Sequence, residues 1–107
     1  MKRYKVSIVP EAKEKMRDYL SYLLFVLRSE QAYYAVKDDY YKTIEKLADI
    51  AGSLQEPIEP ELESRGLKRI HFLNHRYIML YEVDGEEAVV VYIFHETEDY
   101  LNKLDKQ

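Results

Sequence analysis

The sequence contains no cysteine and no long apolar run. Without cysteine, disulfide bonds, thiolate catalysis, zinc–cysteine sites and iron–sulfur clusters are excluded. The longest apolar runs, such as LLFVL and AVVVYIF, fall far below the roughly 20 residues that a membrane-spanning helix needs. The apolar stretch before Pro10 is too brief for the core of a signal peptide. We therefore expect a cytoplasmic protein that is not bound to a membrane.

The length of 107 residues is sufficient for one modest hydrophobic core, so we expect a single domain over residues 1–107. Hydrophobic residues make up 47% of the chain and charged residues 34%, which is ordinary for a soluble globular protein and argues against wholesale disorder. The formal net charge of −4 argues against a general nucleic-acid-coating role.

Positive charge is concentrated in one segment, RGLKRIHFLNHR, at residues 65–76. This segment contains four Lys/Arg side chains, two histidines and no carboxylate, for a formal charge of +4. The rest of the chain sets 12 Lys/Arg against 20 Asp/Glu, a balance of −8. Clustered cations on an acidic protein usually indicate a place where an anion binds, and the segment is therefore the main functional clue.

The first half of the chain shows the pattern of a strand followed by two helices. Residues 4–9 are rich in β-branched side chains and end at Pro10, which suits the first turn of a helix. Apolar residues then recur at three- and four-residue spacings over residues 12–27 and again over residues 33–54, which predicts two amphipathic helices. Ser29 can cap the second helix, and a tight turn beside it makes the pair antiparallel.

The second half is typical of a loop followed by three strands. Residues 55–66 are rich in glutamate and proline, and we expect an acidic surface loop there. Strand-like runs follow at residues 67–72, 77–83 and 88–95. Asp84–Gly85, between the last two runs, is a strong hairpin signal. The tail, residues 96–107, can form a short helix.

The predicted order is β-α-α-β-β-β(-α), which is an α+β fold. Three consecutive strands form an antiparallel meander, and the first strand joins the same sheet by a crossover through the helices. The helical hairpin then packs on one face of a four-stranded, mostly antiparallel sheet. The other face is predicted to be open and curved by the twist of the sheet.

The last hairpin is expected to bring the cationic segment next to the end of the final strand. If its turn is centred on the Asp-Gly pair, residue i lies opposite roughly residue 169 − i, so His95 falls near residues 74–76. By strand alternation, Arg69 and His71 point away from the core, whereas pattern alone leaves the direction of Arg76 open. All three histidines and most of the cationic side chains can then share one neighbourhood.

A cluster of arginine, lysine and histidine can cleave RNA without a metal. The reaction needs a base for the 2′-hydroxyl proton, an acid for the departing 5′-oxygen, and cations that stabilise charge on the phosphate. Histidine can act as base or acid near neutral pH, and arginine can bind two phosphate oxygens. The candidate catalytic residues are His95, Arg76 and Arg69, with Glu96 or Tyr92 as auxiliary acid/base groups.

The remaining cationic residues of the segment are candidates for RNA or phosphate binding: Lys68, His71, His75 and Arg65. Simpler interpretations stand beside these roles. A histidine at a strand end often serves only as a hydrogen-bonded structural group, and surface cations often serve solubility or partner contacts. Metal binding is not expected, because strand and turn geometry separates the two histidines of the segment, and no cofactor is implied.

An ordered set of residues carries a family resemblance. It consists of an arginine in the strand before the turn (Arg69), an Arg-Tyr pair opening the next strand (Arg76, Tyr77), a Tyr-x-Val near its end (Tyr81, Val83), and a histidine after the last hydrophobic strand (His95). Together with YKVSIVPEAKEKMRDYLSYL at the start, this set resembles the RelE/ParE superfamily of toxins from bacterial type II toxin–antitoxin modules. The resemblance implies a protein that arrests growth and is neutralised by a cognate antitoxin, whose extended or helical segment wraps the toxin.

The resemblance implies two mechanisms. RelE-like members cleave mRNA at the ribosome without a metal, through basic and acid/base groups on the concave sheet. Arg69, Arg76 and His95 match positions that this branch uses, and Lys68 is a weaker match. ParE-like members inhibit DNA gyrase and have no accepted catalytic residues.

Our preferred prediction from the sequence is a RelE-like mRNA endoribonuclease. The alternatives are a ParE-like gyrase inhibitor, and a protein that keeps the fold and binds an antitoxin without being toxic. Two features depart from the nuclease pattern: residues 55–66 offer glutamates where nucleases often place lysines, and acidic residues follow His95. An acidic rim of this kind repels RNA phosphate.

Overall fold

A four-stranded sheet organises the fold, and its strands lie where the sequence pattern predicts them. The structure, a computed structural model, describes residues 3–53 and 60–98. Its elements follow the chain as β1 (Lys5–Ile8), α1 (Pro10–Ser21), η1 (Tyr22–Val26), α2 (Glu30–Ile50), α3 (Pro60–Ser64), β2 (Lys68–His71), β3 (Tyr77–Asp84) and β4 (Glu87–His95). The predicted α+β order is confirmed, with η1 and α3 as additions.

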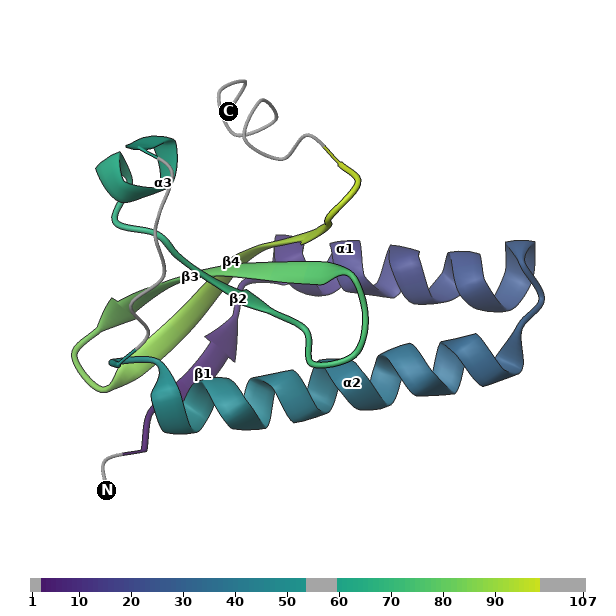
Figure 1. Cartoon of the computed structure of the whole chain (residues 1–107), viewed down its shortest axis with the longest axis horizontal. Coiled ribbons are helices and arrows are strands. Elements are labelled where there is room, and N and C mark those ends of the chain that lie inside the picture. Colours follow the sequence, from purple (N-terminus) through teal and green to yellow (C-terminus); the bar gives the residue numbers. More distant parts are fainter. Residues whose placement is uncertain (1–2, 54–59, 99–107) are drawn as a thin grey trace.

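The strands lie side by side in the order β1-β4-β3-β2 (Figure 1). β1 pairs with β4 in parallel, whereas β4, β3 and β2 are antiparallel neighbours. A parallel pair needs a crossover connection, and α1 and α2 supply it. The predicted mostly antiparallel sheet with a helical crossover is therefore confirmed.

Local sequence signals begin both long helices. Pro10 occupies the first turn of α1, where its missing N–H leaves no helical bond unmade. The Oγ atom of Ser29 accepts a hydrogen bond from the N–H of Ala32 at 3.1 Å and so caps α2. Between the helices the chain forms a π-helical turn, η1, before the tight turn. The N–H of Leu27 donates to the carbonyl of Tyr22 at 3.0 Å, and this i→i+5 bond closes the wider turn.

The main core lies between the sheet and the helical hairpin. Met16 on α1, Leu47 on α2, and Met79 and Tyr81 on β3 are at most 2% exposed. These positions follow the helical and strand periodicities of the sequence. Burying one such side chain contributes about 1.5–3 kcal/mol, so this layer holds the hairpin on the sheet.

The opposite face of the sheet is not fully open, contrary to the prediction, because α3 covers part of it (Figure 1). Residues 60–64 form this helix inside the segment predicted as a loop, and residues 54–59 of that segment lie outside the described residues. Leu62 of α3 is fully buried in a second apolar cluster. The other buried members of that cluster are Leu67, Ile78, Leu80 and Phe94. A five-residue helix with one buried leucine offers no periodicity to detect, which is why the sequence did not predict it.

The chain leaves β4 through a turn in which the N–H of Glu98 donates to the carbonyl of His95 at 2.9 Å. The helix predicted for the tail falls mainly on residues 99–107, which lie outside the described residues. In the part of the chain that the structure describes, no helix is both long and apolar enough to cross a membrane.

Candidate functional site

The ends of β2, β3 and β4 meet at one end of the sheet, where several of the predicted site residues lie. His95 pairs with Tyr77 rather than with residues 74–76, so the predicted register is wrong by a small shift. The N–H of Glu96 donates to the carbonyl of Arg76 at 2.7 Å. The cationic segment and the end of β4 are therefore neighbours, as predicted.

The sheet places the predicted site residues on two different faces. Side chains directly opposite each other in an antiparallel pair share a face. His95 is opposite Tyr77, which belongs to the main core, so His95 lies on the face of the helical hairpin. Arg69 is opposite Leu80 of the second cluster and therefore lies on the α3 face. His71 is opposite Ile78 of the second cluster, so His71 and His95 lie near the same end of the sheet but on opposite faces.

On the α3 face, one carboxylate joins two of the predicted cationic residues. The Oε1 atom of Glu96 lies 3.1 Å from Nδ1 of His71, and its Oε2 atom lies 3.0 Å from Nε of Arg76. We call these three residues the Glu96 cluster. The hydrogen bond from Arg76 is the main cause that holds the pKa of Glu96 below its ordinary value; desolvation opposes it, and His71 acts in the same direction as Arg76. The carboxylate is thus ionised at neutral pH and offsets positive charge in the segment.

Glu96 also determines which nitrogen of His71 carries the proton. A carboxylate only accepts hydrogen bonds, so Nδ1 of a neutral His71 ring holds the hydrogen and Nε2 keeps a lone pair. The His71 side chain is 44% exposed, so this lone pair can be reached from solvent. His71, predicted only as a phosphate contact, therefore has the geometry of a carboxylate-oriented base.

His95 lies on the hairpin face, and the partners of its ring differ from those of His71. The N–H of Thr97 donates to Nδ1 of His95 at 3.2 Å, and the imidazole ring meets the ring of Tyr77 edge-on with centroids 5.0 Å apart. The same Nδ1 atom lies 2.7 Å from the hydroxyl oxygen of Thr97. When Nδ1 accepts from Thr97, the neutral ring carries its hydrogen on Nε2, which is then a donor. A neutral ring held in this way can donate a hydrogen bond from Nε2, but it must release Thr97 before it can act as a base.

Three residues that were not predicted as site residues hold the backbone at His95 and the turn that follows it: Tyr19, Glu98 and Lys15. The backbone N–H of His95 donates to Oη of Tyr19 at 3.1 Å, and the hydroxyl of Tyr19 donates to Glu98. The Nζ atom of Lys15 lies 3.3 Å from Oε2 of Glu98. Helix α1 thus holds the turn that follows β4. These contacts join positions far apart in the sequence, and no local motif signals them.

His75 contacts the helical hairpin through a buried carboxylate. Its Nδ1 atom lies 2.7 Å from Oδ2 of Asp39, whose side chain is 1% exposed. The same carboxylate accepts hydrogen bonds from the backbone N–H groups of Leu73 and Asn74, at 3.1 and 3.0 Å. Asp39 therefore fixes the β2–β3 turn, and His75 has a structural contact there. In the sequence, the one sign of this contact is that Asp39 places a carboxylate within the apolar stripe of residues 33–54.

The other predicted residues are distributed over both faces. Arg69 is half-buried, and its Nε atom is buried. Lys68 is opposite Tyr81 of the main core and so lies on the hairpin side of the edge strand β2. Arg65 and Tyr92 line a shallow hollow of about 390 Å³ on the α3 face.

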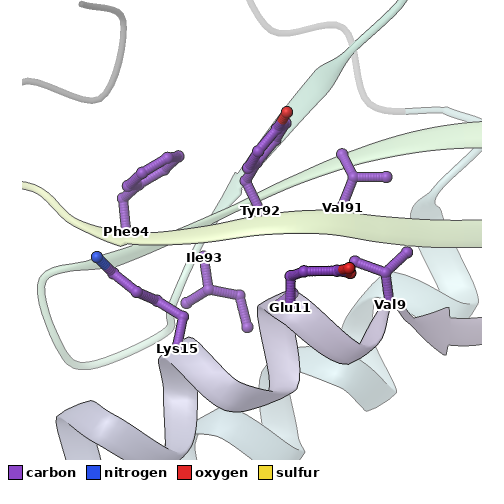
Figure 2. A pocket seen from close by; sticks show the side chains of 8 residues that line it. Val9, Glu11, Lys15, Val91, Tyr92, Ile93 and Phe94 are labelled. Atoms are coloured by element: carbon purple, nitrogen blue, oxygen red, sulfur yellow. The ribbon is translucent and has the colours of Figure 1, made fainter. Parts of the chain in front are cut away.

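An apolar groove lies between α1 and β4, and its lining includes one predicted site residue, Tyr92 (Figure 2). It has a volume of about 540 Å³ and is lined mainly by Val9, Glu11, Ala12, Lys15 and residues 91–94. Figure 2 shows Ile93 directed toward α1, whereas Tyr92 and Phe94 point to the other side of β4. The last residue of β1 in the pairing is Ile8, so β4 continues beyond its parallel partner. The groove suits a protein segment better than a phosphate, because most of its lining is apolar.

Comparisons with known proteins agree with this fold. The sequence profile described as ParE toxin of type II toxin-antitoxin system, parDE, matches residues 6–100. Among solved structures, a chain of a chromosomal ParDE toxin–antitoxin system from P. aeruginosa aligns with a TM-score of 0.68 at 16% sequence identity, covering 87% of this chain and 96% of that chain. This likeness shows a shared fold. The comparison with curated proteins gives no match. The RelE/ParE resemblance is thus confirmed, and the chain belongs to the ParE toxin family of type II toxin–antitoxin systems.

Proposed function

We propose that this toxin inhibits DNA gyrase by binding it and does not cleave RNA. The observation that carries the proposal is the separation of the predicted catalytic set, with His95 on the hairpin face and Arg69 on the α3 face. Membership of the ParE family supports gyrase as the target, because ParE-like members of the superfamily act on it without catalytic residues. The cognate antitoxin is the partner that neutralises the toxin.

The charges at the end of the sheet also favour this proposal. Glu96 lies between His71 and Arg76, and its lowered pKa keeps it ionised at neutral pH. Glu98 follows and already pairs with Lys15. An RNA phosphate approaching this end would meet carboxylates and would have to take Arg76 away from one of them, which is unfavourable.

A second candidate function has one specific observation in its favour. The Glu96 cluster holds His71 with Nδ1 on the carboxylate, which leaves Nε2 able to accept a proton. In an endoribonuclease mechanism, His71 would take the 2′-hydroxyl proton and Arg76 would bind the phosphate. This mechanism uses His71 in the role that the sequence analysis assigned to His95, and its acid must come from another group.

Growth and cleavage assays on four forms of the chain separate the two candidates. The forms are the wild type and the variants His71→Ala, Arg76→Ala and His95→Ala, each checked for folding by circular dichroism. Gyrase inhibition predicts that every folded variant still arrests growth and that primer extension on translated mRNA finds no new 5′ ends. If the wild type produces such ends and His71→Ala or Arg76→Ala abolishes both the ends and the arrest, the nuclease is correct. A wild type that does not arrest growth would indicate a protein that keeps the fold without toxicity.

A further inference from the structure

The connection between α1 and α2 exposes a dense group of apolar side chains. Tyr22, Phe25, Val26 and Leu27 are 52%, 71%, 63% and 55% exposed, and η1 contains no buried residue. We call residues 22–30 the hairpin tip. Since an aromatic side chain offers roughly 150–250 Å² when fully exposed, these four side chains present on the order of 400 Å². Apolar patches of this size on a soluble domain usually mark an interaction site.

Two opposite charges border the apolar surface of the tip. Arg28 and Glu30 line a hollow of about 470 Å³ together with Leu24 and Phe25. Both charged side chains are exposed, and among residues 3–53 and 60–98 neither forms an ion pair. Arg28 adopts a φ of +54°, and the next residue donates its N–H to the carbonyl of Leu23 at 3.0 Å. The backbone that presents the two charges is therefore hydrogen-bonded and well defined.

We propose that the hairpin tip is the contact surface for a second copy of this chain. A two-fold contact uses the same patch on both partners, so that patch must be complementary to itself. The tip meets this condition because it combines a protruding ring, Phe25, with the adjacent hollow. It also carries one charge of each sign, so Arg28 of each copy can face Glu30 of the other.

The size of the tip predicts how strong the dimer is, and its charge favours a second copy of the chain over a membrane surface. The apolar area is about half of the roughly 800 Å² that each partner buries in a standard interface, so the dimer is weak and depends on concentration. An anionic membrane surface would be favoured by a cationic rim, whereas Glu30 balances Arg28 here. Figure 1 shows the tip at the opposite end of the molecule from the β3–β4 turn. Pairing through the tip therefore leaves the β3–β4 turn accessible.

Sedimentation velocity on the purified full-length chain, between about 1 µM and 1 mM, tests the proposal. The wild type should pass from monomer to dimer over this range. Leu27→Glu should raise the dimer dissociation constant at least about tenfold, because it places a carboxylate in the centre of the contact. The matched control is Leu73→Glu, which changes another exposed leucine, 42% exposed in the β2–β3 turn, and should leave the constant unchanged.

Charge reversal gives a second test that does not depend on apolar burial. Arg28→Glu and Glu30→Arg should each weaken self-association by roughly threefold to tenfold, because each brings like charges together. An equimolar mixture of the two variants should restore dimers, since every facing pair is then opposite in sign. The proposal is wrong if the wild type remains monomeric throughout, if Leu27→Glu and Leu73→Glu behave alike, or if the mixture stays monomeric. A monomer that instead sediments with anionic lipid vesicles would also overturn it.

Discussion

The Nδ1 atom of His75 lies 2.7 Å from the Oδ2 atom of Asp39, and this contact joins the β2–β3 turn to the middle of α2. Asp39 is 1% exposed, and its carboxylate accepts three hydrogen bonds, all from the turn. A buried carboxylate is tolerated only when such partners replace its hydration. The turn between the cationic strands is therefore held by a residue of the helical hairpin.

Removing this carboxylate should destabilise the protein strongly. Asp39→Ala leaves the two backbone donors and His75 without their acceptor, and we expect the free energy of unfolding to fall by about 3 kcal/mol. Urea denaturation followed by circular dichroism measures the change. Asp38→Ala is the matched control, because Asp38 is exposed and forms an exposed ion pair with Lys42, so its effect should stay within about 1 kcal/mol. Equal losses in the two variants would contradict the role given to Asp39.

The bridge from Arg76 to Glu96 predicts a specific titration. Arg76→Ala should raise the pKa of Glu96 toward its ordinary value, as measured by carboxyl NMR titration. Because the folded-state pKa of Glu96 lies below the unfolded value, its contribution to stability is present above the unfolded pKa and is lost as the pH falls through the folded pKa. The wild type and Arg76→Ala should thus differ more in stability near neutral pH than in acid. An unchanged Glu96 pKa in the variant would show that this bridge does not form in solution.

Alkaline pH should lower the free energy of unfolding, because one buried tyrosine of the helical hairpin then ionises. Burial, with a smaller effect of Tyr41, raises the pKa of Tyr40 from 10.0 to about 12. The folded-state pKa is the higher one, so this contribution to stability is intact below pH 10 and declines as the pH rises toward 12. Relative to Tyr40→Phe, the wild type should lose roughly 2–3 kcal/mol of unfolding free energy over that range.

Tyr34→Phe is the matched control for this alkaline effect, because Tyr34 lies on the same helix and is 63% exposed. The unfolding free energies of the three proteins can be compared by urea denaturation at several pH values. If the difference between wild type and Tyr40→Phe stays constant with pH, desolvation of Tyr40 is not the cause of any alkaline instability.

Most of the fold could be predicted because its signals are local. Pro10 begins α1, and Ser29 caps α2 with a hydrogen bond that the residue type alone suggests. Gly85 has a φ of +62°, which suits the tight turn of the predicted hairpin. The elements that were not predicted are η1 and α3, and the single buried residue of α3, Leu62, is anchored by long-range packing that a short segment cannot reveal.

The candidate site could be predicted only in part, because it depends on register. The β3–β4 turn consists of Gly85 and Glu86, one residue beyond the predicted centre, and a bulge lies between Leu80 and Tyr81. Strand β4 is apolar on both faces, so neither shift changes its hydrophobic pattern. The sequence therefore could not predict on which face of the sheet His95 lies. Its backbone N–H contacts Glu98, three residues along the chain, and Tyr19 of α1, a distant segment that only the folded chain brings close.

Inhibition of gyrase by binding is the function that we propose for this ParE-family toxin. The most direct measurement is a gyrase supercoiling assay with the purified wild-type chain and, beside it, a chain carrying His71→Ala, Arg76→Ala and His95→Ala together. Both chains should inhibit supercoiling, and the cognate antitoxin should relieve the inhibition. Full supercoiling in the presence of a wild-type chain that still arrests growth would contradict it.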